Sequence, residues 1–394
     1  MHEFFRHHKQ IVCVAIFLTS SGFLFAQNIP DSCAVRDWFQ LRDSVAHDNG
    51  SLLCKGVMDA AFEHRHTAER ELTEFIRKEP NSKEVGNARD TLISLSFRHG
   101  QYQKTLLQVD QGLREWPNAE DLIGLRSMVA VLAQSPGLRV AHSARVTVQG
   151  ENILDTGANI SVISESEAKR LGLVIRDTSS KIGDIGGSAG AMRLTEAPDL
   201  WIGDFHLKNV AFAVLPDADE PFVGEPVDHQ GVLGIPIFLA LESLRFEKNG
   251  QIVVRPTHAG ASRPSASLAF NGHNPLMQLL FQRKPLTFTL DTGADGTYLY
   301  KPFADKFPVL MQEGKQHQKQ VTGVFGSSSQ DSIDMGSLRL SVAQSEVELK
   351  PATVILNATT DTSKWTDGNF GFDLLQKMLP VTIDFHAMQM SFGN

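Results

Sequence analysis

Hydrophobic residues at helical spacing dominate the first third of the chain. Between residues 102 and 116 they recur every three or four positions, which places them on one face of an α-helix: Tyr102, Leu106, Val109, Leu113 and Trp116. Similar stripes occur at 68–76 and 85–95. We therefore expect residues 27–135 to form an all-α domain.

A weak internal repeat runs through this helical region. The hexapeptide at 76–81 has a related copy at 113–118, 37 positions later, and both contain a Pro-Asn pair. A period of this length is typical of helix-turn-helix repeats. The region resembles tetratricopeptide arrays, with Gly100 and Tyr102 at the start of one helix. A small helical bundle of another kind fits the same pattern.

After residue 135 the pattern changes to short alternating strands separated by glycines and turn residues. Segments 145–148, 286–290 and 337–341 are predicted strands. A stretch rich in proline, glycine and serine near residue 260 predicts a linker. The expected organisation is a first mainly-β half at 136–257, a linker at 258–266 and a second half at 267–394.

Three landmarks recur in both halves at nearly the same offset. The tetrapeptide Asp-Thr-Gly-Ala stands at 155–158 and again at 291–294, 136 positions later. The Val-Leu-Gly element at 232–234 corresponds to Asn-Phe-Gly at 369–371, 137 positions later. The glycine-rich turn at Gly186 corresponds to the turn at Gly326, 140 positions later. Landmarks that keep register over a whole half indicate a duplication.

The first 26 residues are typical of a secretory signal. Arg6 and Lys9 precede an apolar run at 11–25, which Ala26 follows at a cleavage position. An uncleaved anchor is the alternative, although the run is short for a membrane-spanning helix. We expect an exported protein, periplasmic or secreted, with no stable membrane span once the signal is cleaved.

Composition excludes several function classes. The chain has 394 residues, 42% of them apolar, and 45 acidic against 37 basic side chains, which argues against a general nucleic-acid binder. Three cysteines rule out a disulfide-dense scaffold and a four-cysteine zinc module. Outside the signal only Cys33 and Cys54 remain, and export favours a disulfide between them over two separate thiols. We expect no metal and no cofactor.

The repeated tetrapeptide can carry acid–base chemistry. A strand that ends in Asp-Thr-Gly places a carboxylate at a tight turn, where the glycine leaves the backbone open. In a duplicated pair related by a twofold axis, two such turns would face each other. Two facing carboxylates share one proton, so one can act as a general base on water while the other donates to a carbonyl oxygen.

The region from 137 to 394 resembles the aspartic proteases. It is more similar to the retropepsin-like branch, because Ala158 and Ala294 stand where pepsins carry serine or threonine. The resemblance implies a multi-domain protein: an all-α domain followed by a mainly-β acid-protease pseudo-dimer, with both retropepsin-like halves in one chain. It also implies an aspartic endopeptidase that cleaves polypeptides, with Asp155 and Asp291 as the catalytic pair.

The same resemblance implies supporting roles for other residues. Thr156 and Thr292 would brace the two loops, Gly157 and Gly293 would allow close approach, and the glycine-rich turns would close over an extended peptide: the flap candidates are Gly186, Gly187 and Gly326. Asn369 departs from the family pattern, which has an apolar residue there. The alternative function is a non-catalytic peptide-binding or assembly protein with a degenerate protease domain. A protein partner for the helical domain stays open.

Overall fold

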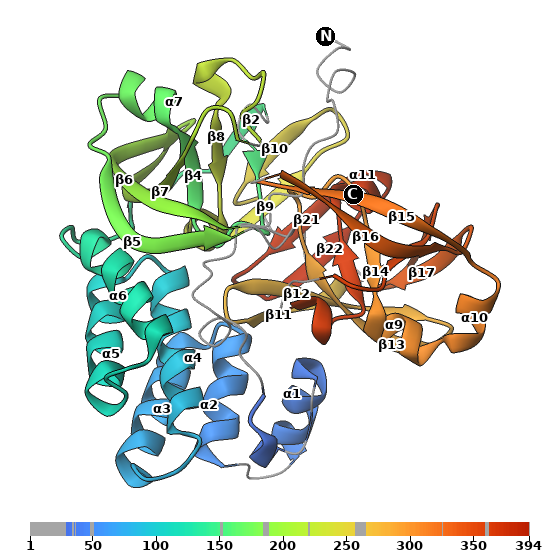
Figure 1. The fold of residues 1–394 in the computed structure, drawn as a ribbon, viewed down its shortest axis with the longest axis horizontal. Coiled ribbons are helices and arrows are strands. Elements are labelled where there is room, and N and C mark those ends of the chain that lie inside the picture. Colours follow the sequence, from blue (N-terminus) through green and yellow to red (C-terminus); the bar gives the residue numbers. More distant parts are fainter. Residues whose placement is uncertain are drawn as a thin grey trace.

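The computed structural model consists of a helical N-terminal region and a larger mainly-β region with two lobes (Figure 1). It describes residues 29–33, 35, 37–47, 51–149, 153–183, 189–219, 221–256, 265–324, 326–358 and 362–393. The expected signal peptide, most of the expected linker, and the flap candidates Gly186 and Gly187 lie outside these residues.

The helical region contains six α-helices after a short 3₁₀ turn at Asp31–Cys33. In chain order they are α1 (Trp38–His47), α2 (Leu52–Ala61), α3 (Arg65–Lys78), α4 (Val85–Arg98), α5 (Tyr102–Glu115) and α6 (Glu120–Leu132). From α1 to α6 each helix packs against the next. The predicted stripe of α5 buries Tyr102 and Val109, but Trp116 lies beyond the helix end and is 40% exposed. The following Pro117 explains this end, because a residue before proline disfavours helical geometry.

A disulfide fixes the beginning of the described chain to the helices. Cys33 and Cys54 are bonded, with their Cα atoms 5.6 Å apart, so the segment before α1 is tied to α2. The Ser51 hydroxyl caps the same helix by accepting a hydrogen bond from the Cys54 amide at 3.2 Å.

The first β lobe is built around a seven-stranded sheet with the order β3-β8-β4-β7-β6-β5, and β1 also pairs with β7. This part of the chain also contributes three strands, β2, β9 and β10, to a sheet that both lobes share. In chain order its elements are β1 (Arg139–His142), β2 (Val146–Gln149), β3 (Ile153–Leu154), β4 (Ser161–Ser164), α7 (Glu165–Arg170), β5 (Arg176–Gly183), β6 (Ala189–Ile202), β7 (Phe205–Leu215), β8 (Gly231–Leu233), α8 (Ile235–Leu241), β9 (Ser243–Phe246) and β10 (Gln251–Val254).

The second lobe follows a related order of elements. They are β11 (Ser265–Asn271), β12 (Asn274–Phe281), β13 (Lys284–Leu290), β14 (Tyr298–Tyr300), α9 (Lys301–Lys306), α10 (Pro308–Gln312), β15 (Lys315–Gly323), β16 (Gly326–Asp334), β17 (Leu338–Val342), β18 (Ser345–Leu349), β19 (Thr353–Ile355), β20 (Gly368–Phe370), α11 (Phe372–Lys377), β21 (Val381–Asp384) and β22 (Gln389–Phe392). The last two residues of the expected linker, 265 and 266, belong to β11, because they pair with β22.

One antiparallel sheet joins the two lobes. At its centre β9 pairs with β21, with Ser243 opposite Asp384 and Phe246 opposite Val381. On one side β10 and β2 extend this sheet, and on the other side β22 and β11 do so. The two central strands follow α8 and α11, which occupy corresponding places in the two lobes.

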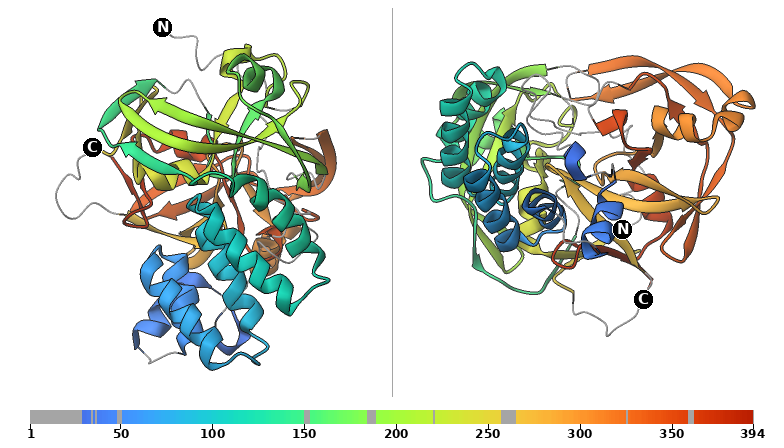
Figure 2. Two further views of the ribbon diagram at one scale, coloured as in Figure 1. Left: turned by 90° about the vertical axis from the view of Figure 1, so that its left-hand side faces the viewer. Right: turned by 90° about the horizontal axis from the view of Figure 1, so that it is seen from below.

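The helical region contacts both lobes. Figure 2 shows α2 to α6 packed along one side of the β region, mainly over the first lobe. The Ser180 hydroxyl of β5 donates to the Gly124 carbonyl of α6 at 2.5 Å, and the Ser179 amide donates to Ser127 at 2.9 Å. Toward the second lobe, the buried Arg98 donates to the carbonyl of Gly272 at 2.7 Å.

Candidate active site

The two predicted catalytic aspartates stand at equivalent strand ends. β3 lies parallel to β8, and the Asp155 amide that follows β3 donates to the Leu233 carbonyl at 3.0 Å. β13 lies parallel to β20, and the Asp291 amide donates to the Phe370 carbonyl at 3.0 Å. The same backbone geometry therefore presents a carboxyl group from each lobe.

Reciprocal hydrogen bonds between two threonines hold the loops together. The Thr156 amide donates to Oγ1 of Thr292 at 3.0 Å, and the Thr292 amide donates to Oγ1 of Thr156 at 3.0 Å. Each hydroxyl then donates across to the opposite strand, Thr156 to Leu290 at 2.7 Å and Thr292 to Leu154 at 2.6 Å. All four groups are paired across the lobes, so the loops form one rigid unit.

The two carboxyl groups are buried at the centre of this unit. The Gly157 amide donates to Oδ1 of Asp155 at 2.7 Å, and the Gly293 amide donates to Oδ1 of Asp291 at 3.1 Å. Asp155 is fully buried and Asp291 is 3% exposed. Oδ2 of Asp155 has no hydrogen-bond partner within the described chain.

Burial raises the pKa of both carboxyl groups. Burial raises the pKa of Asp155 well above its usual value, and the negative charge of Asp291 adds to this. Burial also raises the pKa of Asp291 to about 6, although hydrogen bonds from Asp155 and from the amides of Gly293 and Ala294 oppose the rise. Two facing buried carboxyl groups of raised pKa favour a state with one proton, which belongs to both residues together.

A second pair of hydroxyl groups supports the loops from behind. Ser161 accepts from the Gly234 amide at 3.1 Å, and Thr297 accepts from the Gly371 amide at 2.9 Å. These glycines directly precede α8 and α11 as their N-cap residues. Each lies next to the backbone carbonyl of a loop alanine, Ala158 or Ala294. The sequence analysis missed both hydroxyl residues. A hydroxyl residue six positions after each aspartate was the signal that could have revealed them.

Only part of the predicted flaps can be placed. Gly326 begins β16 and pairs with Gly323 of β15, so it lies at the tip of a hairpin. Val324 in this tip is 2% exposed and belongs to a buried apolar cluster of first-lobe and helical residues that includes Val162 and Val232. The tip of the second-lobe hairpin therefore packs onto the first lobe.

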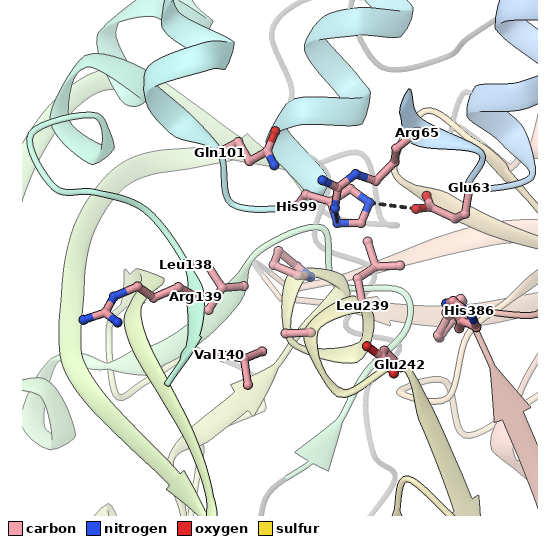
Figure 3. Close-up of a pocket in the computed structure, with 13 residues that line it drawn as sticks. Glu63, Arg65, His99, Gln101, Leu138, Arg139, Val140, Leu239, Glu242 and His386 are labelled. Carbon is pink, nitrogen blue, oxygen red and sulfur yellow. Dashed lines mark hydrogen bonds and ion pairs between the residues drawn. The ribbon is translucent and has the colours of Figure 1, made fainter. Parts of the chain in front are cut away.

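A pocket of about 320 Å³ lies elsewhere, where the helical region, α8 and the segment after β21 meet. Figure 3 shows the Glu63 carboxylate and the His99 ring joined at one end of this pocket, with Leu239 of α8 nearby. Neither predicted catalytic aspartate lines it.

Among the described residues no group of three or more His, Cys, Asp or Glu is arranged to hold a metal ion.

Comparisons with known proteins match parts of this chain. Residues 133–237, which include Asp155 and most of the first lobe, match the family model described as aspartyl protease. Among solved structures the chain is similar to a retropepsin-like aspartic protease from Rickettsia conorii. The identity is 16%, the match covers 32% of this chain and 90% of that chain, and the TM-score is 0.23. No curated protein matches the chain.

In the part of the chain that is described, every helix is too short or too polar to span a lipid bilayer.

Proposed function

We propose that the chain is an aspartic endopeptidase in which Asp155 and Asp291 form one catalytic pair. The observation that carries this proposal is the reciprocal Thr156–Thr292 bonding, which fixes two buried carboxyl groups of raised pKa against each other. The aspartyl protease match over residues 133–237 supports the same reaction class.

The proposed chemistry uses the single proton that the pair holds. The ionised carboxyl group accepts a proton from water, whose oxygen attacks the peptide carbonyl carbon. The protonated carboxyl group donates to the carbonyl oxygen, which gives a neutral tetrahedral diol. Collapse of the diol breaks the C–N bond and transfers a proton to the leaving nitrogen. The products are a carboxylic acid and an amine, and the pair regains its starting proton.

We further propose that the site lies between two tandem retropepsin-like halves. The family match covers only the first half, so the second half rests on three observations. β13 pairs with β20 as β3 pairs with β8, and β14 pairs with β20 as β4 pairs with β8. β9 and β21 also pair antiparallel between the halves, as equivalent strands related by a twofold axis would.

Peptide-library cleavage by the mature protein between pH 3 and pH 8 tests the proposal. Asp155→Asn and Asp291→Asn should each abolish turnover, and the double variant should be no worse, because members of one catalytic unit are not additive. Asp204→Asn, in an exposed turn between β6 and β7, is the matched control and should keep full activity. Activity near half in either single variant would instead indicate two sites formed between chains.

Binding separates the enzyme from a peptide-binding protein. A statine-type mimic of the tetrahedral diol should bind the wild-type protein and should lose affinity in Asp291→Asn. Equal binding to both, without any cleavage, would favour the non-catalytic alternative.

We also propose export to the periplasm or the medium, because of the N-terminal signal pattern and the Cys33–Cys54 disulfide. Cell fractionation with N-terminal sequencing tests this.

A further inference from the structure

The strand that carries Asp291 also carries a polar side chain on the same face. Asp291 directly follows β13, and its amide continues the pairing of that strand with β20 by donating to the Phe370 carbonyl. Residues two apart along an extended chain point to the same side, so Thr289 and Asp291 share a face of the sheet. Thr289 is paired in register with Asn369 of β20, and its hydroxyl donates to Oδ1 of Asn369 at 2.8 Å. The opposite face holds Phe288 and Leu290, which are buried in the core.

This polar face lies beneath the β15–β16 hairpin. Asn369 stands directly opposite Tyr298 of β14, so the two side chains share the face. Nζ of Lys319, on β15, lies 5.8 Å from the centroid of the Tyr298 ring. The face that bears the Asp291 carboxyl group is therefore the one that the hairpin covers, where an extended peptide would lie in the proposed enzyme.

The equivalent face of the first lobe is apolar. Val232 of β8 takes the place of Asn369, and it stands opposite Val162 of β4 as Asn369 stands opposite Tyr298. Both valines are fully buried, and they share an apolar cluster with Val324. At these equivalent positions the first lobe carries hydrocarbon side chains, whereas the second lobe carries hydroxyl and amide groups.

One group on the polar face has an unused hydrogen-bonding capacity. Asn369 is 2% exposed, and its Nδ2 has no acceptor within the described chain. A buried donor without an acceptor is destabilising, so a purely structural asparagine would be expected to have both ends of its amide paired. A donor that is left free beside the carboxyl group is suited to an acceptor brought by a ligand.

We propose that Thr289, Tyr298 and Asn369 form a polar subsite next to Asp291, which binds a substrate side chain with an acceptor oxygen, of the amide or carboxylate kind. The apolar face around Val162 and Val232 binds an aliphatic side chain on the other side of the scissile bond. The Lys319 ammonium group adds a positive charge above the polar subsite. This inference rests on the proposed function for the identity of the ligand as a peptide.

Binding of uncleavable peptides tests the subsite without requiring turnover. The probes are hexapeptides with a reduced central bond that carry Leu–Leu, Leu–Gln or Gln–Leu at the two central positions. One Gln-containing probe should bind about tenfold or more tightly than the Leu–Leu probe, because a site with a free donor rejects an analogue that lacks the acceptor. Asn369→Val, which copies Val232, should reverse this order. Asn249→Val, in an exposed turn between β9 and β10, should leave the order unchanged.

The outcomes separate the inference from the proposed function. Tightest binding of the Leu–Leu probe, or an order that Asn369→Val does not change, would overturn the polar subsite even if the wild-type protein cleaves peptides. A Gln preference that depends on Asn369, in a protein that cleaves no peptide, would support the subsite and contradict the endopeptidase. Thermal unfolding of Asn369→Val checks that the variant is folded, and Asn369→Gln, which keeps the amide, should retain part of the Gln preference.

Discussion

Gly157 and Asp291 lie so close together that no side chain fits between them. A Cβ atom placed on Gly157 would lie 2.7 Å from Cγ of Asp291, and one on Gly293 would lie 2.3 Å from Cγ of Asp155. Each glycine thus sets the approach of the opposite carboxyl group. The obstructing atoms belong to short side chains that can turn aside, so the fold can survive a substitution that the carboxyl geometry cannot.

Gly157→Ala and Gly293→Ala should therefore lower kcat/KM by about a hundredfold or more, because displacement of a catalytic group by about 1 Å costs that much. Stability should fall by about 1–3 kcal/mol at most. Peptide cleavage and urea unfolding measure the two effects. Gly86→Ala is the matched control, since nothing lies within 4 Å of its Cβ, and it should leave cleavage unchanged. Full activity of either loop variant would contradict the close-approach argument.

A buried ion pair within the helical region holds an arginine that also reaches the second lobe. The Arg98 side chain is fully buried, its Nε lies 2.7 Å from Glu63, and its Nη1 donates to the Gly272 carbonyl. Burial alone would raise the pKa of Glu63, but the charges of Arg98 and His99 and their hydrogen bonds outweigh it and lower the pKa to about 2. Glu63→Gln leaves the arginine uncompensated and should destabilise the protein by about 3–5 kcal/mol at pH 7.

The pH dependence of this loss has a definite sign. Because the pKa of Glu63 is lower in the folded protein than in the unfolded chain, its contribution is present above the unfolded value of about 4.5 and is lost as the pH falls toward 2. The difference between wild type and Glu63→Gln in urea unfolding should shrink between pH 5 and pH 3. Glu165→Gln, which weakens solvent-accessible pairs with Lys169 and Arg193, should cost about 1 kcal/mol or less. A pH-independent gap would refute the electrostatic explanation.

Local patterns in the sequence predicted three of the helices and the strand before Asp291, because both depend on nearby residues. The stripe from Tyr102 onward is α5, and the predicted strand at 286–290 lies within β13. Asn369 was also recognised as a departure from an apolar pattern. Its position beside Thr289, however, depends on the parallel pairing of β13 with β20, which joins segments 80 residues apart.

The docking of the helical region could not be predicted from the sequence. Arg98 ends α4 and would ordinarily be solvent-exposed, but in the fold it reaches Gly272, 174 positions later. Hydrophobic periodicity carries no information about such a contact, since a single side chain and one backbone carbonyl define it. The pairing of β9 with β21 was likewise invisible, because strands 138 residues apart have no local signal for their register.

The Cys33–Cys54 disulfide should stabilise the helical region. It closes a loop of 21 residues, and in the chain-entropy model a loop of this length contributes about 3 kcal/mol. The double variant Cys33→Ala/Cys54→Ala should therefore unfold at a lower urea concentration, and its free energy of unfolding should be lower by about 3 kcal/mol. Alkylation under non-reducing denaturing conditions, followed by mass spectrometry, checks the bond directly. Two cysteines that both react under these conditions would contradict it.

The alanines that follow the two glycines should set the pH range of activity. Burial raises the pKa of Asp291 to about 6 and also raises that of Asp155, so we expect the form with one shared proton to appear as the pH rises through about 6. Ala158 and Ala294 are buried and have no side-chain donor that could favour ionisation. Activity should therefore peak nearer neutrality than in a pepsin-type site, which has a hydroxyl at that position.

Ala158→Ser/Ala294→Ser should then move the acid limb of kcat/KM to lower pH. A hydroxyl that donates to the ionised carboxylate stabilises it, so the first proton leaves the pair at lower pH. Ala158→Cys/Ala294→Cys adds a group of comparable size with a weak donor, so its profile should stay close to that of the wild type. The measurement is kcat/KM for one peptide between pH 3 and pH 8 in all three proteins. An acid limb at the same pH in the serine and cysteine variants would mean that burial alone, and not the missing donor, holds the proton.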